Sequence, residues 1–271
     1  MFGLAASAGL LLVGAASATT NIEKQRTDDE GVSGSIQADG AMEFGTVNLV
    51  RLETEAAVYW NDGTNHVLVL GESAFESERS SDDTGDQAGS ILEKEWRVYN
   101  SGLAHMRYGH DLYPRLRPEV FVGLSYDEFL YLEQRWILGV GPRIAVAAQE
   151  TFRTHVGISW MWEYERSNPR VVVEDPDRQL SRLSTYTSAG VAVGESMELG
   201  ATVYLQPALT NWADYRVLAD VLWTVELGKQ WETGIEVEAR YDSDPPSVTD
   251  GHPSLTEWNG AVSVVLLYEF G

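Results

Sequence analysis

The sequence has no cysteine among its 271 residues, which excludes disulfide bonds, thiolate metal sites and thiol catalysis. Basic residues are also scarce: 19 Lys and Arg face 41 Asp and Glu, for a formal net charge of −22. A nucleic-acid interface needs clustered positive charge, so we do not expect nucleic acid as a partner. The same charge disfavours direct adhesion to anionic lipid head groups.

Long apolar runs are missing as well. No stretch of about 18 apolar residues occurs, so no transmembrane helix is expected. Near the N-terminus, the short apolar run Leu10–Val13 precedes Ala16-Ser17-Ala18. This A-x-A pattern predicts a signal peptide over 1–18. No Lys or Arg precedes the run, which would be explained by a true start codon further upstream. The alternative, a buried N-terminal helix, fits the abundance of Ala, Gly and Ser less well.

The chain does contain strict alternation of apolar and polar residues. From Tyr215 to Leu227 every second residue is apolar, and Arg216, Asp220 and Glu226 lie between them. Period-2 alternation predicts a β-strand with one apolar and one charged face. Strands of globular proteins average about 5–6 residues, whereas a strand of about 10 tilted residues crosses a hydrocarbon layer. The pattern therefore predicts transmembrane strands with lipid outside and water or ion pairs inside.

About twelve such strands can be placed, with an uncertainty of two in the count. They predict an all-β fold: an antiparallel up-and-down transmembrane β-barrel over residues 32–271, after a polar lead-in over 19–31. The expected strands cover about 32–44, 47–60, 65–77, 91–109, 116–127, 131–148, 151–165, 179–194, 197–208, 214–227, 232–242 and 256–270.

The connections between these strands give an independent argument. Long polar connections at about 78–90, 166–178 and 243–255 all follow odd-numbered strands. Connections after even-numbered strands are short, such as 61–64 and 194–196. In an up-and-down meander, alternate connections lie at opposite ends. The predicted barrel therefore has one end with tight turns and one with long loops, as bacterial outer-membrane barrels do.

Several motifs, in this order, carry a resemblance to a known family. They are Asn21–Arg26, Gly31–Gly34, Arg107–Arg115, Asp127–Phe129, Leu138–Arg143, Asp214–Arg216, Tyr241–Pro246 and Leu267–Phe270. On them the chain resembles the salt-induced outer membrane protein family, whose domain is of unknown function. The resemblance implies an outer-membrane barrel and a link to salt, and it supplies no catalytic residues. Such barrels often end on Phe, whereas here Gly271 follows Phe270.

The charged face of the strands is the main chemical feature. If the strands on either side of 229–231 pair around a three-residue turn, Asp220 lies opposite Arg240. A shift by two residues would set Glu226 against Glu232, and like charges disfavour that register. The charged face is then either a polar channel lining or a lumen closed by ion pairs. The residues expected to line the lumen are Arg135, Arg143, Arg153, Glu163, Arg216, Asp220, Glu236, Glu238 and Arg240.

Catalytic interpretations of this face are weaker. Glu163 and Glu165 stand about 6.8 Å apart along a strand, a spacing that glycosidases use, but alternating Glu in a wet lumen explains it without catalysis. His155 and Ser159 are about 13 Å apart, too far for a nucleophile and its base. The acidic stretch 82–86 misses the calcium-loop spacing. No enzyme, and no catalytic, cofactor or metal residue, is predicted.

These observations predict a monomeric outer-membrane barrel, exported through its signal peptide and inserted by the barrel-assembly machinery into outer-membrane lipid. Its expected role is a passive pore or an envelope-integrity protein linked to salt stress. One alternative is a non-conducting structural or adhesive barrel with acidic external loops. Another is a soluble periplasmic lipocalin-like ligand binder, which would turn the charged face outward.

Overall fold

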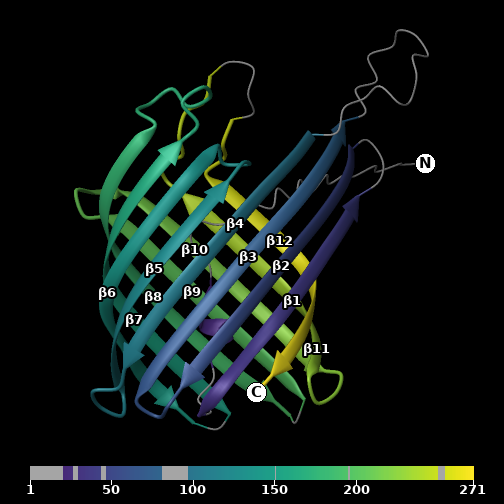
Figure 1. Cartoon of the computed structure of the whole chain (residues 1–271), viewed down its shortest axis with the longest axis vertical. Coiled ribbons are helices and arrows are strands. Elements are labelled where there is room, and N and C mark those ends of the chain that lie inside the picture. Colours follow the sequence, from purple (N-terminus) through teal and green to yellow (C-terminus); the bar gives the residue numbers. More distant parts are fainter. Residues whose placement is uncertain are drawn as a thin grey trace, which may run out of the picture.

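A closed ring of twelve antiparallel strands forms the molecule, with each strand paired to its neighbours in sequence and β1 paired to β12 (Figure 1). The computed structural model describes residues 21–26, 30–43, 47–80, 97–149, 151–194, 196–249 and 254–271. The predicted fold class is confirmed, and each predicted strand has its counterpart. The strands are β1 (Gly31–Glu43), β2 (Val47–Asn61), β3 (Asn65–Ser80), β4 (Arg97–His110), β5 (Leu116–Asp127), β6 (Leu132–Ala148), β7 (Phe152–Ser167), β8 (Asp177–Val193), β9 (Met197–Ala208), β10 (Asn211–Glu226), β11 (Trp231–Asp242) and β12 (Trp258–Phe270).

Some predicted features cannot be placed. The signal peptide over 1–18, the acidic stretch 82–86 and positions 91–96 of the expected fourth strand lie outside the described residues. Within the described part of the chain, no helix is long and apolar enough to cross a membrane. The helix η1 (Glu23–Gln25) is a single 3-10 turn, and Figure 1 shows it inside the ring of strands.

The two faces of the wall differ as the alternation predicts. In β5, Val120 and Val122 point outward and are 42% and 40% exposed, whereas Glu119 is only 4% exposed. The same alternation puts large apolar side chains on the outside of the other strands. Apolar outside and charged inside is the arrangement of an outer-membrane barrel, and the reverse of what a lipocalin-like binder needs.

The two ends of the barrel also differ. One end, the short-turn end, holds the tight turns that follow even-numbered strands and the C-terminus (Figure 1). The other, the loop end, carries the longer connections. Two of these pair with each other through a bridge between Val172 and Val248. The Val173 amide donates to the Ser247 carbonyl at 2.9 Å, so backbone hydrogen bonds join these two loops.

Aromatic side chains are found near both ends of the outer face. Trp60, Trp231 and Phe270 lie at the short-turn end, and Trp212 and Trp258 lie at the loop end; all are exposed. Two such girdles are typical of barrels whose rims meet the two membrane–water interfaces.

The predicted pairing of β10 with β11 is wrong by two residues. Asp220 lies opposite Glu238 rather than Arg240, and Glu226 lies opposite Glu232. Arg240 instead binds Glu238 on its own strand, with its Nη2 atom 2.7 Å from the carboxylate.

The turn explains this difference. The Leu227 amide donates to the Trp231 carbonyl at 2.8 Å, so the chain reverses over 227–230 and Trp231 already belongs to β11. Glu226 is exposed at the short-turn end, where water and salt screen its repulsion from Glu232. The like-charge penalty that disfavoured this register is therefore small.

Candidate functional site

A cluster of buried ion pairs fills one part of the lumen. Glu163 is 0% exposed, and its carboxylate lies 2.5 Å from Arg135, 3.3 Å from Arg182 and 3.0 Å from Arg216. These partners come from β6, β8 and β10, so one carboxylate on β7 connects side chains from three other strands. A charge removed from water in this way is tolerated because each group is paired.

The cluster extends from the arginines to further carboxylates. Arg216 binds Glu165 at 2.9 Å and Asp242 at 2.8 Å, and Arg182 binds Asp214 at 3.0 Å. Three guanidinium groups thus face four carboxylates. We call this set the arginine cluster; it comprises Arg135, Arg182, Arg216, Glu163, Glu165, Asp214 and Asp242.

A second region of the lumen is dominated by acid. Around a cavity of about 30 Å³ stand seven carboxylates and two cationic side chains, Lys24 and Arg240. The carboxylates come from β1, β2, β3, β10 and β11, and β12 lies between β1 and β11 in the closed ring. We call this region the acidic chamber; its carboxylates are Asp39, Glu53, Glu55, Glu72, Asp220, Glu236 and Glu238.

Residues 21–26, which we call the lumen segment, lie inside the barrel. On its acidic side, the Lys24 ammonium is 2.9 Å from Glu236 and 3.4 Å from Glu55. Asn21 donates from Nδ2 to Asp220 at 2.7 Å. The segment therefore contacts the acidic chamber through a cation and an amide donor.

On its other side the lumen segment contacts arginines. Glu23 lies 3.1 Å from Arg143, and Arg26 binds Glu119 through both terminal nitrogens at 2.7 and 3.1 Å. Glu119 also accepts from Arg107 at 2.9 Å. The charges of the segment thus complement the wall on both sides.

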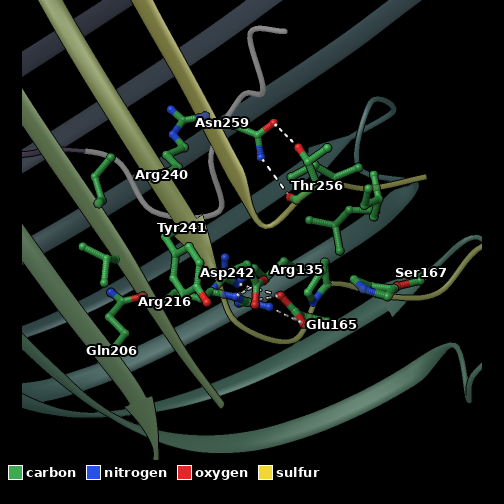
Figure 2. A pocket seen from close by; sticks show the side chains of 17 residues that line it. Arg135, Glu165, Ser167, Gln206, Arg216, Arg240, Tyr241, Asp242, Thr256 and Asn259 are labelled. Carbon is green, nitrogen blue, oxygen red and sulfur yellow. Dashed lines mark hydrogen bonds and ion pairs between the residues drawn. The ribbon is translucent and has the colours of Figure 1, made fainter. Parts of the chain in front are cut away.

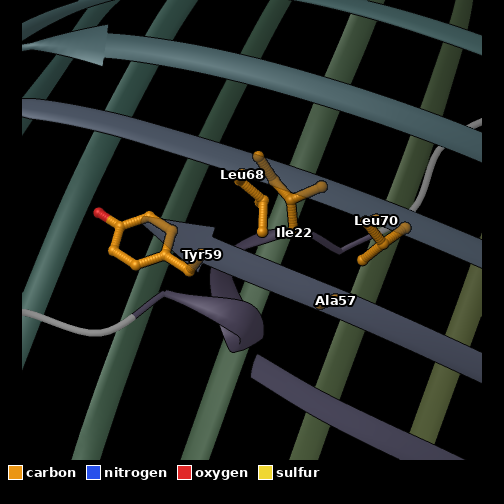
Figure 3. Packing of buried hydrophobic residues seen from close by; sticks show 5 residues of the cluster. All are labelled: Ile22, Ala57, Tyr59, Leu68 and Leu70. Atoms are coloured by element: carbon orange, nitrogen blue, oxygen red, sulfur yellow. The ribbon is translucent and has the colours of Figure 1, made fainter. Parts of the chain in front are cut away.

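An apolar contact anchors the lumen segment between these ion pairs. Ile22 is 1% exposed and packs with Ala57, Tyr59, Leu68 and Leu70 of β2 and β3 (Figure 3). Leu68 and Leu70 point into the lumen, on the face that elsewhere carries charge. Leu68 and Leu70 are apolar at these inward positions because they pack against Ile22.

A larger cavity lies at the loop end. It measures about 110 Å³ and is lined by Arg135 and Arg216 of the arginine cluster, by Arg240, and by Pro245 and Pro246 of the connection after β11 (Figure 2). A water occupies roughly 10–15 Å³ on this measure, so the cavity has room for several waters.

A further polar contact lies at the short-turn end. Asp111, in the turn after β4, lies 2.7 Å from Arg117 and 2.9 Å from His66. Partial burial raises the pKa of the Asp111 carboxyl, but hydrogen bonds from Arg117 and His66 outweigh burial and hold the pKa below its ordinary value.

The structure brings together most of the residues expected to line the lumen. Arg135, Arg143, Glu163, Arg216, Asp220, Glu236, Glu238 and Arg240 are buried or half-buried on the inner face. Arg153 is different, because its side chain is 41% exposed and binds Glu198 toward the short-turn end.

Sequence reasoning missed the most important part of the site. The lumen segment was expected only as part of a polar lead-in over 19–31. Its six residues lack alternation and are too few for a helix or strand pattern, so periodicity could not place them. The available signal was the close spacing of Glu23, Lys24 and Arg26, whose opposite charges suit a doubly charged lumen.

The pairs considered for catalysis have structural partners. Glu163 and Glu165 are both bound by arginines, which leaves neither poised as a general acid. Among the described residues, no group of His, Asp and Glu is arranged to hold a metal ion.

Residues 73–256, more than half of the chain, match the family described as "Protein of unknown function, DUF481". The chain belongs to this family. No curated protein matches the DUF481 chain. The salt-induced name that the motifs suggested stays a prediction.

Solved structures similar to this DUF481 protein are outer-membrane barrels. The COG4313 outer membrane channel from Pseudomonas putida F1 has 9% identity and a TM-score of 0.52, covering 93% of this chain and 100% of that chain. The NanC porin has 9% identity and a TM-score of 0.48, covering 87% and 98%. The anion-selective porin from Comamonas acidovorans has 10% identity and a TM-score of 0.41, covering 88% and 98%. These neighbours are named as a channel and two porins, and at such identities the likeness is one of fold.

Proposed function

We propose that this protein is an outer-membrane channel for small charged solutes, closed in this conformation by its own lumen segment. The observation that carries the proposal is how the segment is held. Its contacts with the wall are ion pairs, side-chain hydrogen bonds and the Ile22 anchor. Such contacts can break without opening the backbone pairing of the barrel. The lumen segment can therefore leave the wall while all twelve strands stay paired. A core built from the strands themselves could not leave in this way.

The charge of the lumen also favours a channel. Ionisable side chains inside a membrane protein are costly and usually line a path for ions or polar solutes. A barrel with only a structural role could fill its interior with small apolar side chains. Here the arginine cluster and the acidic chamber occupy positions that such side chains could take.

The alternative is a non-conducting structural barrel. It is favoured by the ion pairs that fill the lumen, where two of the cavities between them measure only about 110 and 30 Å³. The two proposals differ in one respect: the channel opens when the lumen segment leaves, and the structural barrel does not.

The proposed channel also implies where the protein is located and what it contacts. Export through the signal peptide over 1–18, insertion by the barrel-assembly machinery into outer-membrane lipid, and a monomeric state are its expected context. We also propose that the channel is linked to salt stress. It is tested by measuring conductance at several ionic strengths.

The test is single-channel conductance in planar bilayers. We expect wild-type protein to be mostly closed. The double variant Ile22→Ser/Arg26→Gln removes the apolar anchor and the bond to Glu119, so its open probability should rise at least several-fold. Arg153→Gln makes the same charge change at an exposed pair and should behave as wild type.

A folded double variant that carries no current above the lipid background would overturn the channel and leave the structural barrel. Folding is checked independently by the migration of unheated protein in a detergent gel.

A further inference from the structure

A further cavity, of about 30 Å³, shares no lining residue with the acidic chamber and has a basic lining. It is lined by His105 and Arg107 of β4 and by Arg135 of β6, and no carboxylate is found among its described lining residues. Phe121 of β5 holds two of these side chains: its ring stacks on His105 with the centroids 5.7 Å apart, and the Arg107 guanidinium lies 4.4 Å from its centroid. Ile22 of the lumen segment is also part of the lining. We call this space the basic cavity.

Each basic side chain of the cavity carries a nitrogen that has no hydrogen-bond partner in the described part of the chain. These atoms are Nε of Arg107, Nη1 of Arg135 and Nε2 of His105. The three residues are only 7%, 1% and 6% exposed, so bulk water does not satisfy them. The histidine nitrogen donates in one of the two ring tautomers. Unpaired buried donors are costly, so an acceptor is expected in the space that these side chains line.

The ion pairs beside the basic cavity leave one positive charge over. Arg107 and Arg26 share Glu119, and Arg26 and Arg143 share Glu23, with N–O distances of 2.7, 2.9, 2.9 and 3.1 Å. Within the described residues, these three arginines therefore form ion pairs with two carboxylates. One anion would balance the set, and such charge interactions are strong where little water screens them.

Arg135 does not change this count, because the arginine cluster to which it belongs is balanced. Arg178 also binds Asp214, at 2.6 Å, so four guanidinium groups face the four carboxylates of the cluster. The other partner of Arg178, Asp244, is exposed to water. The extra positive charge therefore lies on the Arg107 side of the basic cavity.

We propose that the basic cavity is a binding site for a monatomic anion of the halide class, such as chloride. The cavity has room for about two waters, which suits one halide and excludes sulfate or an organic acid. A halide accepts hydrogen bonds and donates none, so it matches a lining of unpaired donors, whereas a water must also place its own two hydrogens. The inference goes beyond the proposed function, because an anion is held here whether or not the barrel conducts.

The test is the unfolding midpoint of the detergent-solubilised protein as chloride replaces gluconate at constant sodium concentration. Ionic strength then stays fixed, and gluconate is too large for the cavity. We expect the midpoint to rise with chloride and to saturate about 2–4 °C higher, because a ligand that binds only the folded state stabilises it. Bromide should act as chloride does. A midpoint that does not depend on the halide would overturn the site and leave water in the cavity.

Two variants locate the halide. His105→Phe keeps a ring against Phe121 and removes the Nε2 donor, so the halide concentration needed for half of the rise should increase at least several-fold. Arg153→Gln changes an exposed pair outside the cavity and should keep the wild-type response. Equal responses of folded His105→Phe and wild type would place the halide elsewhere and overturn the site.

A third variant supplies an anion from the wall itself. Ser125 is buried and lines the basic cavity. Ser125→Asp should fold without halide, as its migration in a detergent gel would show, and its midpoint should no longer respond to chloride. A full chloride response in the folded variant would contradict the proposal.

The halide site and the channel can fail separately. A saturating chloride response in wild type, together with no current from the folded variant Ile22→Ser/Arg26→Gln, would retain the site and overturn the channel. Current from that variant without any chloride response in wild type would do the opposite.

Discussion

Glu163 shows how one residue can connect a large part of the wall. Its carboxylate meets arginines from β6, β8 and β10, and it has no exposed surface. Removing one partner from a buried cluster leaves the other charges uncompensated. We therefore expect Glu163→Gln to lower the free energy of unfolding by about 3–5 kcal/mol.

Equilibrium unfolding in urea, in lipid vesicles, measures this loss. Glu198→Gln is the matched control, since Glu198 pairs with Arg153 at an exposed position and its loss should cost at most about 1 kcal/mol. Equal effects of the two substitutions would contradict the special role of the cluster.

At the scale of a single residue, Asp111 also predicts how the stability of the fold depends on pH. Its folded pKa lies below its unfolded pKa, because hydrogen bonds from Arg117 and His66 outweigh the effect of burial. It therefore stabilises the fold at pH values above the ordinary Asp pKa of about 3.9, and this contribution is lost as the pH falls through the folded value.

The variant Asp111→Asn should accordingly be less stable than wild type at neutral pH, and the difference should shrink below about pH 4. Unfolding free energies measured between neutral and acidic pH check this. A difference that stays constant over the whole range would show that ionisation of Asp111 is not the cause.

Among the elements, the strands could be predicted and the lumen segment could not. Strands such as β5 and β7 alternate because one face meets lipid and the other meets charge, and this pattern repeats over many residues. In β8 the signal is weaker, because Ser181, Thr185 and Thr187 lie on its outer face. Arg182 was missed as a lumen residue for that reason.

The predicted register between β10 and β11 was wrong for a different reason. Both registers put the same residues inside, so the alternation could not choose between them. The choice depended on how many residues form the turn and on how strongly water screens Glu226 from Glu232.

The lumen segment itself offers an element-scale prediction. The chain has no cysteine, so an introduced pair is unique. Ile22→Cys with Leu68→Cys places thiols on two side chains that belong to one buried cluster (Figure 3). A short thiol-reactive cross-linker that joins them should hold the segment in place and abolish channel opening, and a cleavable linker should restore it on reduction.

Conductance before and after cleavage measures this effect. Each single-cysteine variant, treated in the same way, is the control, because it is modified without being joined to the wall. Undiminished opening in the cross-linked protein would mean that the segment is not the gate.

For the whole molecule, the closed ring of strands predicts resistance to detergent. Every strand is paired on both edges, which leaves no free edge for detergent or another chain to attack. Unheated protein from the carbonate-resistant membrane fraction should therefore migrate differently in a detergent gel from boiled protein. A soluble protein without such a shift would overturn the membrane assignment of the outer face.

The position of the lumen segment constrains how the barrel is assembled. The segment precedes β1, and the ring closes where β1 meets β12, from Gly34 with Phe270 to Asp39 with Val265. Six residues that precede β1 thus lie within a wall whose last strand pairing, between β1 and β12, needs the C-terminal strand. The order of events matters: either the segment is in place before the seam forms, or it threads in afterwards from the short-turn end.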